Sequence, residues 1–125
     1  MKKSILSSKA PAPIGPFSQA IVTQGTLLFV SGSIGMTMKG VLAEGGIKAQ
    51  TKQALENINA VLTEAGYTFA DVVKVNVFLT DMLDFVAMSE VYSEYFSKPE
   101  PARTTVQVLG LPKNAIVEIE LTAVK

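Results

Sequence analysis

Apolar residues recur at helical spacing between Ile47 and Ala65. They fall at i, i+3 and i+4, which places one apolar stripe along a helix. The stripe comprises Ala54, Leu55, Ile58, Val61, Leu62 and Ala65. Gly66 follows directly and predicts the end of this helix, because glycine readily adopts the left-handed conformation that closes a helix.

A second helix is expected from Met82 to about Phe96. Asp81 is a typical N-cap residue, and Pro99 and Pro101 prevent the helix from continuing. The residues that this helix would turn toward a core are Phe85, Met88, Tyr92, Tyr95 and Phe96.

Five segments have the alternation or the composition of β-strands. Their ranges are Ser18–Thr23, Leu27–Ile34, Val72–Thr80, Arg103–Leu109 and Ile116–Val124. Gln24-Gly25-Thr26 separates the first two, which predicts a β-hairpin. In the last strand, Val117, Ile119, Leu121 and Ala123 point to one side, and Glu118, Glu120 and Thr122 to the other.

The order β-β-α-β-α-β-β predicts one α+β domain over residues 1–125, with two helices on one face of a mixed sheet. The opposite face then needs solvent or a partner. Because polar and apolar residues mix on it, this face suits an oligomer interface that contains a site, and we expect Phe78, Arg103, Thr105 and Glu118 on it.

Composition removes several kinds of chemistry. The chain has no histidine and no cysteine, which excludes Ser-His-Asp triads, thiolate nucleophiles and the common zinc sites. Eleven Lys and Arg balance eleven Asp and Glu, so binding driven by nucleic-acid phosphates is not expected. No stretch is long and apolar enough for a signal peptide or a membrane span, and we expect a soluble, cytoplasmic protein.

Arg103 is the single arginine, beside ten lysines. Since this chain uses lysine where only a positive charge is needed, Arg103 is a candidate for binding a carboxylate or phosphate through its planar fork. The alternative is an ordinary structural ion pair.

Glu118 is the candidate partner of Arg103 on an adjacent strand. The two residues would form either a carboxylate clamp with a general base or a salt bridge between strands. Glu120 shares the face of Glu118, so the two carboxylates are either an acid–base pair or part of a solvated face.

Three further residues have both a functional and a structural interpretation. Gly32 either offers a backbone N–H to an anion or marks a bulge in its strand. Phe17 is either the wall of a pocket or a core residue, and Thr105 either binds substrate or reflects strand propensity.

Several segments together resemble the RidA (YjgF) family of enamine/imine deaminases. They are Ala12–Ala20, Val30–Ile34, the helix that contains Asn57, Val72–Asp81, Tyr92–Phe96, Pro101–Val108, Leu111-Pro112 and Val117–Glu120. The resemblance covers nearly the whole chain in order. Its most specific part is the pattern that begins at Pro101-Ala102-Arg103 and ends at Val117-Glu118-Ile119-Glu120.

The resemblance implies a chorismate-mutase-like α+β fold and a homotrimer with three sites in the clefts between subunits. It also implies a reaction without cofactor or metal: a 2-aminoacrylate-type enamine or 2-imino acid is hydrolysed to a 2-oxo acid and ammonia. Arg103 would bind the substrate carboxylate, with the Gly32 N–H as a second donor, and Glu118 would activate water. Thr105 would line the cleft, and Phe17 is expected from a neighbouring subunit.

The chain departs from the usual family pattern at four positions. Phe17 stands where tyrosine is common, Thr105 where cysteine is common, Ser33 where glutamine is frequent and Ser89 where asparagine is usual. These changes leave the carboxylate clamp and the acid intact, whereas substrate range and rate depend on them.

Two other function classes remain open from the sequence. One is a non-catalytic trimer that binds metabolites or acts like a chaperone. The other is an endoribonuclease that inhibits translation, an activity that the family resemblance also brings and that the neutral charge argues against.

Overall fold

The computed structural model describes residues 1–125. The strands are β1 (Lys2–Ile5), β2 (Ala20–Thr23), β3 (Leu27–Ile34), β4 (Val72–Leu79), β5 (Ala102–Gln107) and β6 (Val117–Val124). The helices are α1 (Gly46–Ala65) and α2 (Phe85–Tyr92), and short 3-10 turns cover Phe69–Asp71, Met82–Asp84 and Pro112–Asn114.

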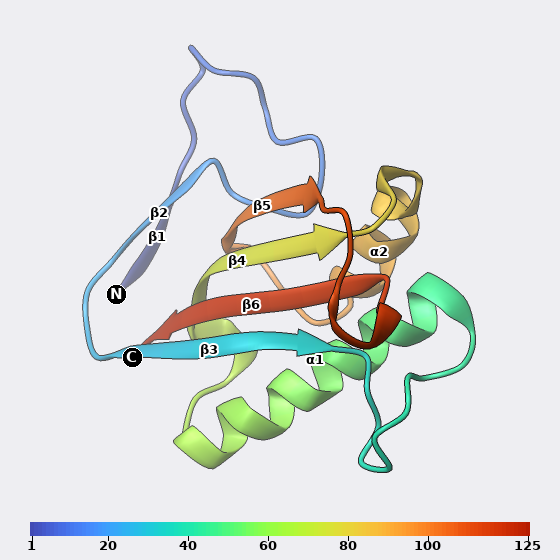
Figure 1. The fold of residues 1–125 in the computed structure, drawn as a ribbon. Helices are drawn as coiled ribbons and strands as arrows, with labels where there is room; N and C mark the ends of the chain where they lie inside the picture. The colour runs from blue at the N-terminus through green and yellow to red at the C-terminus, as the bar shows by residue number, and fades with distance from the viewer.

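The main sheet has the strand order β3-β6-β4-β5. β6 is antiparallel to both of its neighbours, and β4 and β5 are parallel. Both helices lie on one face of this sheet, behind it in the view of Figure 1. The predicted class, an α+β fold with two helices on one face of a mixed sheet, is confirmed.

The predicted hairpin between the first two strands is wrong. β2 pairs instead with β1, from Lys2 opposite Thr23 to Ile5 opposite Ala20, in a separate two-stranded sheet. The chain turns at Gly25, and Thr26 then exchanges backbone hydrogen bonds with Lys125 at the C-terminus. This exchange starts β3 alongside β6 and not alongside β2.

α1 ends as predicted, and Gly66 adopts the left-handed conformation with φ 82°. Ala54, Leu55, Ile58 and Leu62 are completely buried. Val61, which the helical spacing assigns to the same stripe, is 49% exposed. It lies beside β3, the edge strand of the sheet, where no further strand covers it.

The second predicted helix is shorter than expected. A 3-10 turn follows the predicted cap, where the Asp81 carboxylate accepts a hydrogen bond of 2.9 Å from the Leu83 backbone N–H. α2 then ends at Tyr92, before the prolines. The expected core residues Met88, Tyr92 and Phe96 are buried.

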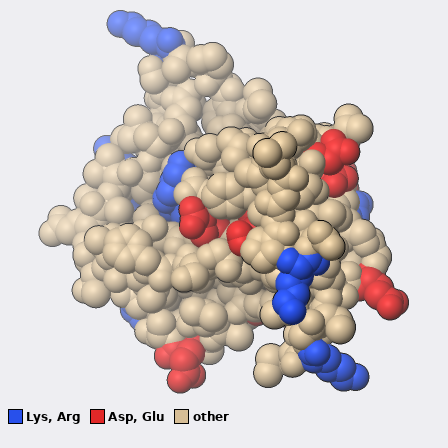
Figure 2. Space-filling view, viewed as in Figure 1, with Lys and Arg blue, Asp and Glu red and all other residues tan.

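The strand alternation is also confirmed. The predicted inward residues of β6 and the alternate residues of β4 from Val75 onward are buried in the core beneath the helices, and they are Val75, Val77, Leu79, Val117, Ile119, Leu121 and Ala123. At the start of β4 the register with β6 shifts, and Val72 belongs to this core in place of Val73. The other face of the sheet carries Lys74, Glu118 and Glu120, and charges of both signs lie near the middle of this open face (Figure 2). No helix has the length and hydrophobicity that a membrane span requires.

Gly35 sets the distance between the end of β3 and α1. A Cβ atom at this position would lie 2.5 Å from the backbone oxygen of Gln50, so the helix would have to shift. We expect Gly35→Ala to lower the free energy of unfolding by about 1–3 kcal/mol, as overpacked sites do. Urea unfolding measures the difference, and Gly110→Ala is the control, because no atom lies within 4 Å of its added Cβ. Equal midpoints for the two variants would contradict this role of Gly35.

Candidate functional site

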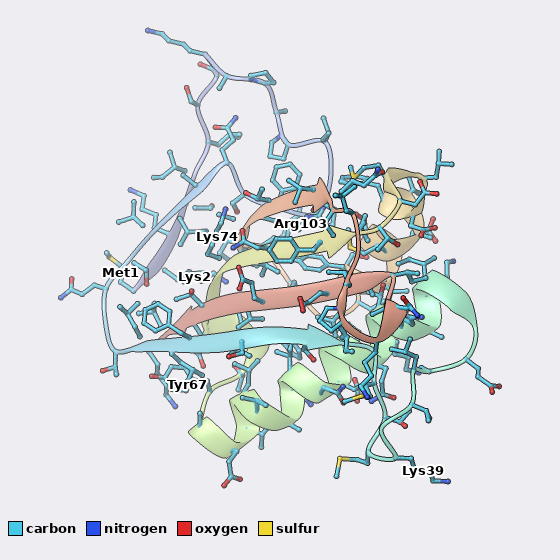
Figure 3. All side chains as sticks on the ribbon, in the orientation of Figure 1. Met1, Lys2, Lys39, Tyr67, Lys74 and Arg103 are labelled. Carbon is cyan, nitrogen blue, oxygen red and sulfur yellow. The ribbon has the colours of Figure 1, made fainter.

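Arg103 and Thr105 lie on the helix-facing side of the sheet, because their partners in register, Val75 and Val77, are buried in the core. Their expected place on the open face with Glu118 is therefore wrong. Figure 3 shows Arg103 on β5. Arg103 is only 8% exposed. The single ion pair of the chain joins Lys48 to Glu90 at 2.9 Å on the surface, so Arg103 has no carboxylate partner. A buried charge without a counterion is costly, which makes this residue the first candidate for ligand binding.

Three aromatic rings surround the guanidinium of Arg103. Its central carbon lies 4.8 Å from the ring centroid of Tyr92, 5.3 Å from that of Phe85 and 5.4 Å from that of Phe17. Tyr92 and Phe85 belong to α2, and Phe17 lies just before β2 in the same chain. Phe17 therefore contacts Arg103 within one chain, and its expected origin in a neighbouring subunit is wrong.

The guanidinium makes little use of its hydrogen-bond donors. Nη2 donates to Ser89 Oγ at 3.2 Å, whereas Nη1 is buried without a partner. Thr105 Oγ1, two residues along on the same face of β5, is also buried without a partner. Two adjacent polar groups in this state indicate a place for a polar ligand atom.

Burial affects the ionisation of both residues that meet here. It lowers the pKa of Arg103, which the proximity of Tyr92 partly offsets, and arginine nevertheless stays protonated in proteins. Burial raises the pKa of Tyr92 above the usual tyrosine value, and the charge of Arg103 opposes this rise. At neutral pH the protonated guanidinium of Arg103 therefore contacts the uncharged ring of Tyr92.

A cavity of about 290 Å³ lies close to Arg103, although neither Arg103 nor Thr105 lines it. It is lined by Ile14, Gly15, Pro16, Phe85, Val86, Ser89, Glu90 and Ser93. Two of these residues adjoin Nη2: Ser89 accepts its hydrogen bond, and a Cβ atom at Gly15 would lie 3.3 Å from it. The cavity walls are largely apolar, and its volume suits a small organic acid.

Gly32 and Glu118 form a second group. A Cβ atom at Gly32 would lie 2.8 Å from Cδ of Glu118, so a larger residue here would displace the end of the Glu118 side chain. The register of β3 with β6 shifts between Val30 and Ser33, which is the bulge that Gly32 was expected to mark. Glu118 accepts no hydrogen bond from the chain, whereas Glu120 accepts one of 3.1 Å from Asn76 Nδ2. Glu118 is therefore the free carboxylate of the two.

The sheet separates these two groups. β4 lies between β5 and β6, so the expectation that Arg103 and Glu118 stand on adjacent strands is wrong. Arg103 is in register with buried Val75, while Glu118 is in register with Phe78, an odd number of residues farther along β4. Because strand side chains alternate, Arg103 and Glu118 point to opposite faces. No salt bridge joins them within one chain.

The sequence did not identify Phe85 and Tyr92 as neighbours of Arg103. Both were expected in the core, from the apolar face of their helix. The register that brings β5 beneath α2 depends on contacts between distant segments. The described side chains also include no group of three or more acidic residues placed to hold a metal ion.

Comparisons with known proteins agree with this fold. A family model described as Endoribonuclease L-PSP matches residues 7–125. A RutC family protein of Pyrococcus horikoshii is 52% identical over 126 residues, which cover 100% of this chain and 99% of that protein. The 2-iminobutanoate/2-iminopropanoate deaminase of Bos taurus is 45% identical, in a match that covers 100% of this chain and 91% of that protein. The crystal structure of RidA from an Antarctic Psychrobacter is 44% identical with a TM-score of 0.77, over 98% of this chain and 99% of that one. The chain therefore belongs to the Endoribonuclease L-PSP family, which is the RidA (YjgF) family that its sequence resembles.

Proposed function

We propose that this protein hydrolyses 2-imino acids, or the enamines that tautomerise to them, to 2-oxo acids and ammonia. The observation that carries the proposal is the buried guanidinium of Arg103, which lacks a carboxylate partner and leaves Nη1 without a hydrogen bond. A cavity of about 290 Å³ lies close to it. A small 2-imino acid supplies the missing carboxylate. The deaminase among the relatives supports the same substrate class.

In this proposal each group has a distinct role. Arg103 binds the substrate carboxylate through free donors, and Thr105 Oγ1 hydrogen-bonds the substrate or the attacking water. Glu118 accepts a proton from water as the C–O bond forms and the C=N electron pair moves to nitrogen. Glu118 then gives this proton to the nitrogen, which becomes an amine beside the new hydroxyl. The hydroxyl passes its own proton through Glu118 to the same nitrogen as the C–N bond breaks, so that a carbonyl forms and ammonia leaves. Because the imine carbon is already electrophilic, positioning and one carboxylate are sufficient.

The complete site requires more than one chain, and we place it between the subunits of a homotrimer. Arg103 and Glu118 point to opposite faces, so one chain cannot offer both side chains to one small substrate. The open face also carries Phe29, which is 73% exposed, among polar groups. Such a mixture suits a subunit interface. Gly32 and Glu118 of one subunit would then meet Arg103 of the next.

The family description also raises an endoribonuclease. Nucleic-acid sites hold phosphates on exposed basic surfaces, whereas the cation of this site is 8% exposed and enclosed by three rings. The chain has no net charge to attract a polyanion. These features favour a small carboxylate over an RNA backbone.

Arg103→Lys tests the carboxylate clamp. We expect kcat/KM to fall about 10- to 150-fold, the effect of losing a charge-assisted hydrogen bond, because the ammonium keeps the charge but loses the fork. A pyridoxal-phosphate lyase acting on serine would generate 2-aminoacrylate in the assay, and pyruvate formation would report its hydrolysis. Circular dichroism checks that the variant is folded. Full activity in the lysine variant would remove the clamp from the mechanism.

Glu118→Gln tests the general base, and Glu120→Gln is its matched control on the same strand face. We expect the first to lower kcat by about 10²- to 10⁴-fold, because proton transfer contributes on this scale, and the second to stay near wild type. An equal loss in both variants would contradict the assignment of Glu118.

The same variants test whether the site is shared. Glu118→Gln and Arg103→Lys chains, refolded together, should recover part of the activity, because mixed trimers contain some sites with both native residues. No recovery, with mixed trimers shown by native mass spectrometry, would contradict a site between subunits.

Thr105→Val separates ligand binding from stability. Removing a buried hydroxyl without a partner should leave the free energy of unfolding unchanged or raise it by about 1 kcal/mol. The KM should nevertheless rise several-fold. Thr51→Val on α1 is the control, since Thr51 Oγ1 is also buried without a partner, and its KM should not change. Parallel urea unfolding and kinetics test both variants, and an unchanged KM in Thr105→Val would assign Thr105 to packing alone.

A further inference from the structure

We propose that Phe85 and Tyr92 are positioning residues for Arg103. They hold its guanidinium in place with ring faces and so leave its N–H donors free for a carboxylate. The proposal rests on the proposed function for the identity of the ligand. Independently of that ligand, it explains how the fold holds a buried arginine in place without a carboxylate partner.

Most buried arginines are fixed by carboxylates, which use up the donors of the guanidinium. Here the neighbours of the cation are three aromatic rings, at 4.8 to 5.4 Å from the central carbon. A ring face attracts a cation through its quadrupole and takes up none of the in-plane N–H donors. Only Nη2 is bonded, at 3.2 Å to the hydroxyl of Ser89. The guanidinium is therefore confined without being neutralised.

Two of the three rings come from one rigid element. Phe85 and Tyr92 are seven residues apart, about two turns of α2, and so project from the same side of the helix. Tyr92 stacks on Phe96 at 4.4 Å, and Phe96 meets Phe69 edge to face at 5.1 Å. This series of rings connects the site to the hydrophobic core, which fixes the ring nearest to the cation.

The hydroxyl of Tyr92 does not hold Arg103 through a hydrogen bond. It is buried and makes no hydrogen bond. The ring is therefore the part of Tyr92 that holds Arg103, and Tyr92→Phe is the conservative variant that keeps it. Tyr92→Leu removes the ring and keeps an apolar side chain in the core.

The single arginine makes the arrangement directly measurable. Protein labelled with ¹⁵N-arginine gives one Nε–Hε signal, which belongs to Arg103. We expect this signal to be displaced by ring currents from its position in free arginine, with slow rotation of the guanidinium. Adding 2-oxobutanoate as the carboxylate probe should shift it further.

Tyr92→Leu should move this signal toward that of free arginine. It should also raise the Kd of 2-oxobutanoate and the KM of the substrate about 5- to 30-fold, because the guanidinium is no longer held in place. The kcat should change less than threefold. Tyr92→Phe should restore the wild-type signal and KM. Tyr95→Leu is the matched control. It removes a ring that packs on Phe69 and does not contact Arg103, so it should lower stability without moving the signal or the KM.

An unchanged Arg103 signal and Kd in Tyr92→Leu would overturn the proposal, whatever happens to stability. If that variant does not fold, Phe85→Leu, at a partly buried position, decides the question with the same readouts. If wild type binds 2-oxobutanoate, and Tyr92→Leu weakens that binding, while no 2-imino acid is turned over, the deaminase fails and the role of the rings stands. The two failures are therefore distinguishable.

Discussion

One uncompensated charge organises this molecule. Removing an arginine from water costs several kcal/mol unless partners replace the lost hydration. Arg103 has three ring faces and one hydroxyl as its partners and no carboxylate. The rings offset part of the cost and keep the cation in place, but they cannot satisfy its donors. The remaining deficit is what a carboxylate ligand would relieve.

The order of the strands decides where that charge points. β5 joins the sheet at its edge, parallel to β4, in a register that turns Arg103 and Thr105 toward α2. β6 lies between β3 and β4 and turns Glu118 to the opposite face. The residues that the proposed reaction needs thus lie on opposite faces of one sheet, with Arg103 and Thr105 on one face and Glu118 on the other. In the proposed trimer, the open face of one subunit supplies the half that its neighbour lacks.

Local patterns in the sequence predicted most of the helices and strands. They predicted few of the contacts between segments that are distant in the chain. The alternation in β4 and β6 and the glycine at the end of α1 depend on a few consecutive residues, and they were read correctly. The pairing of β1 with β2 was missed, because Lys2, Lys3 and Ser4 have no apolar signal and their partner strand lies 15 or more residues away. The same difference between local and distant information applies to the site. Arg103 stood out as the single arginine, whereas its rings come from positions 17, 85 and 92, and only the folded chain brings them together.

The small set of side chains available here fits an undemanding reaction. A chain without histidine and cysteine lacks the side chain that most often exchanges protons near neutral pH and the side chain that supplies thiolate nucleophiles. Hydrolysis of an imine needs less, since the carbon is activated before the substrate arrives. What the protein adds is orientation, which a fork-shaped donor provides and a flexible lysine does not. The use of one arginine among ten lysines, buried among three rings, is consistent with that single requirement.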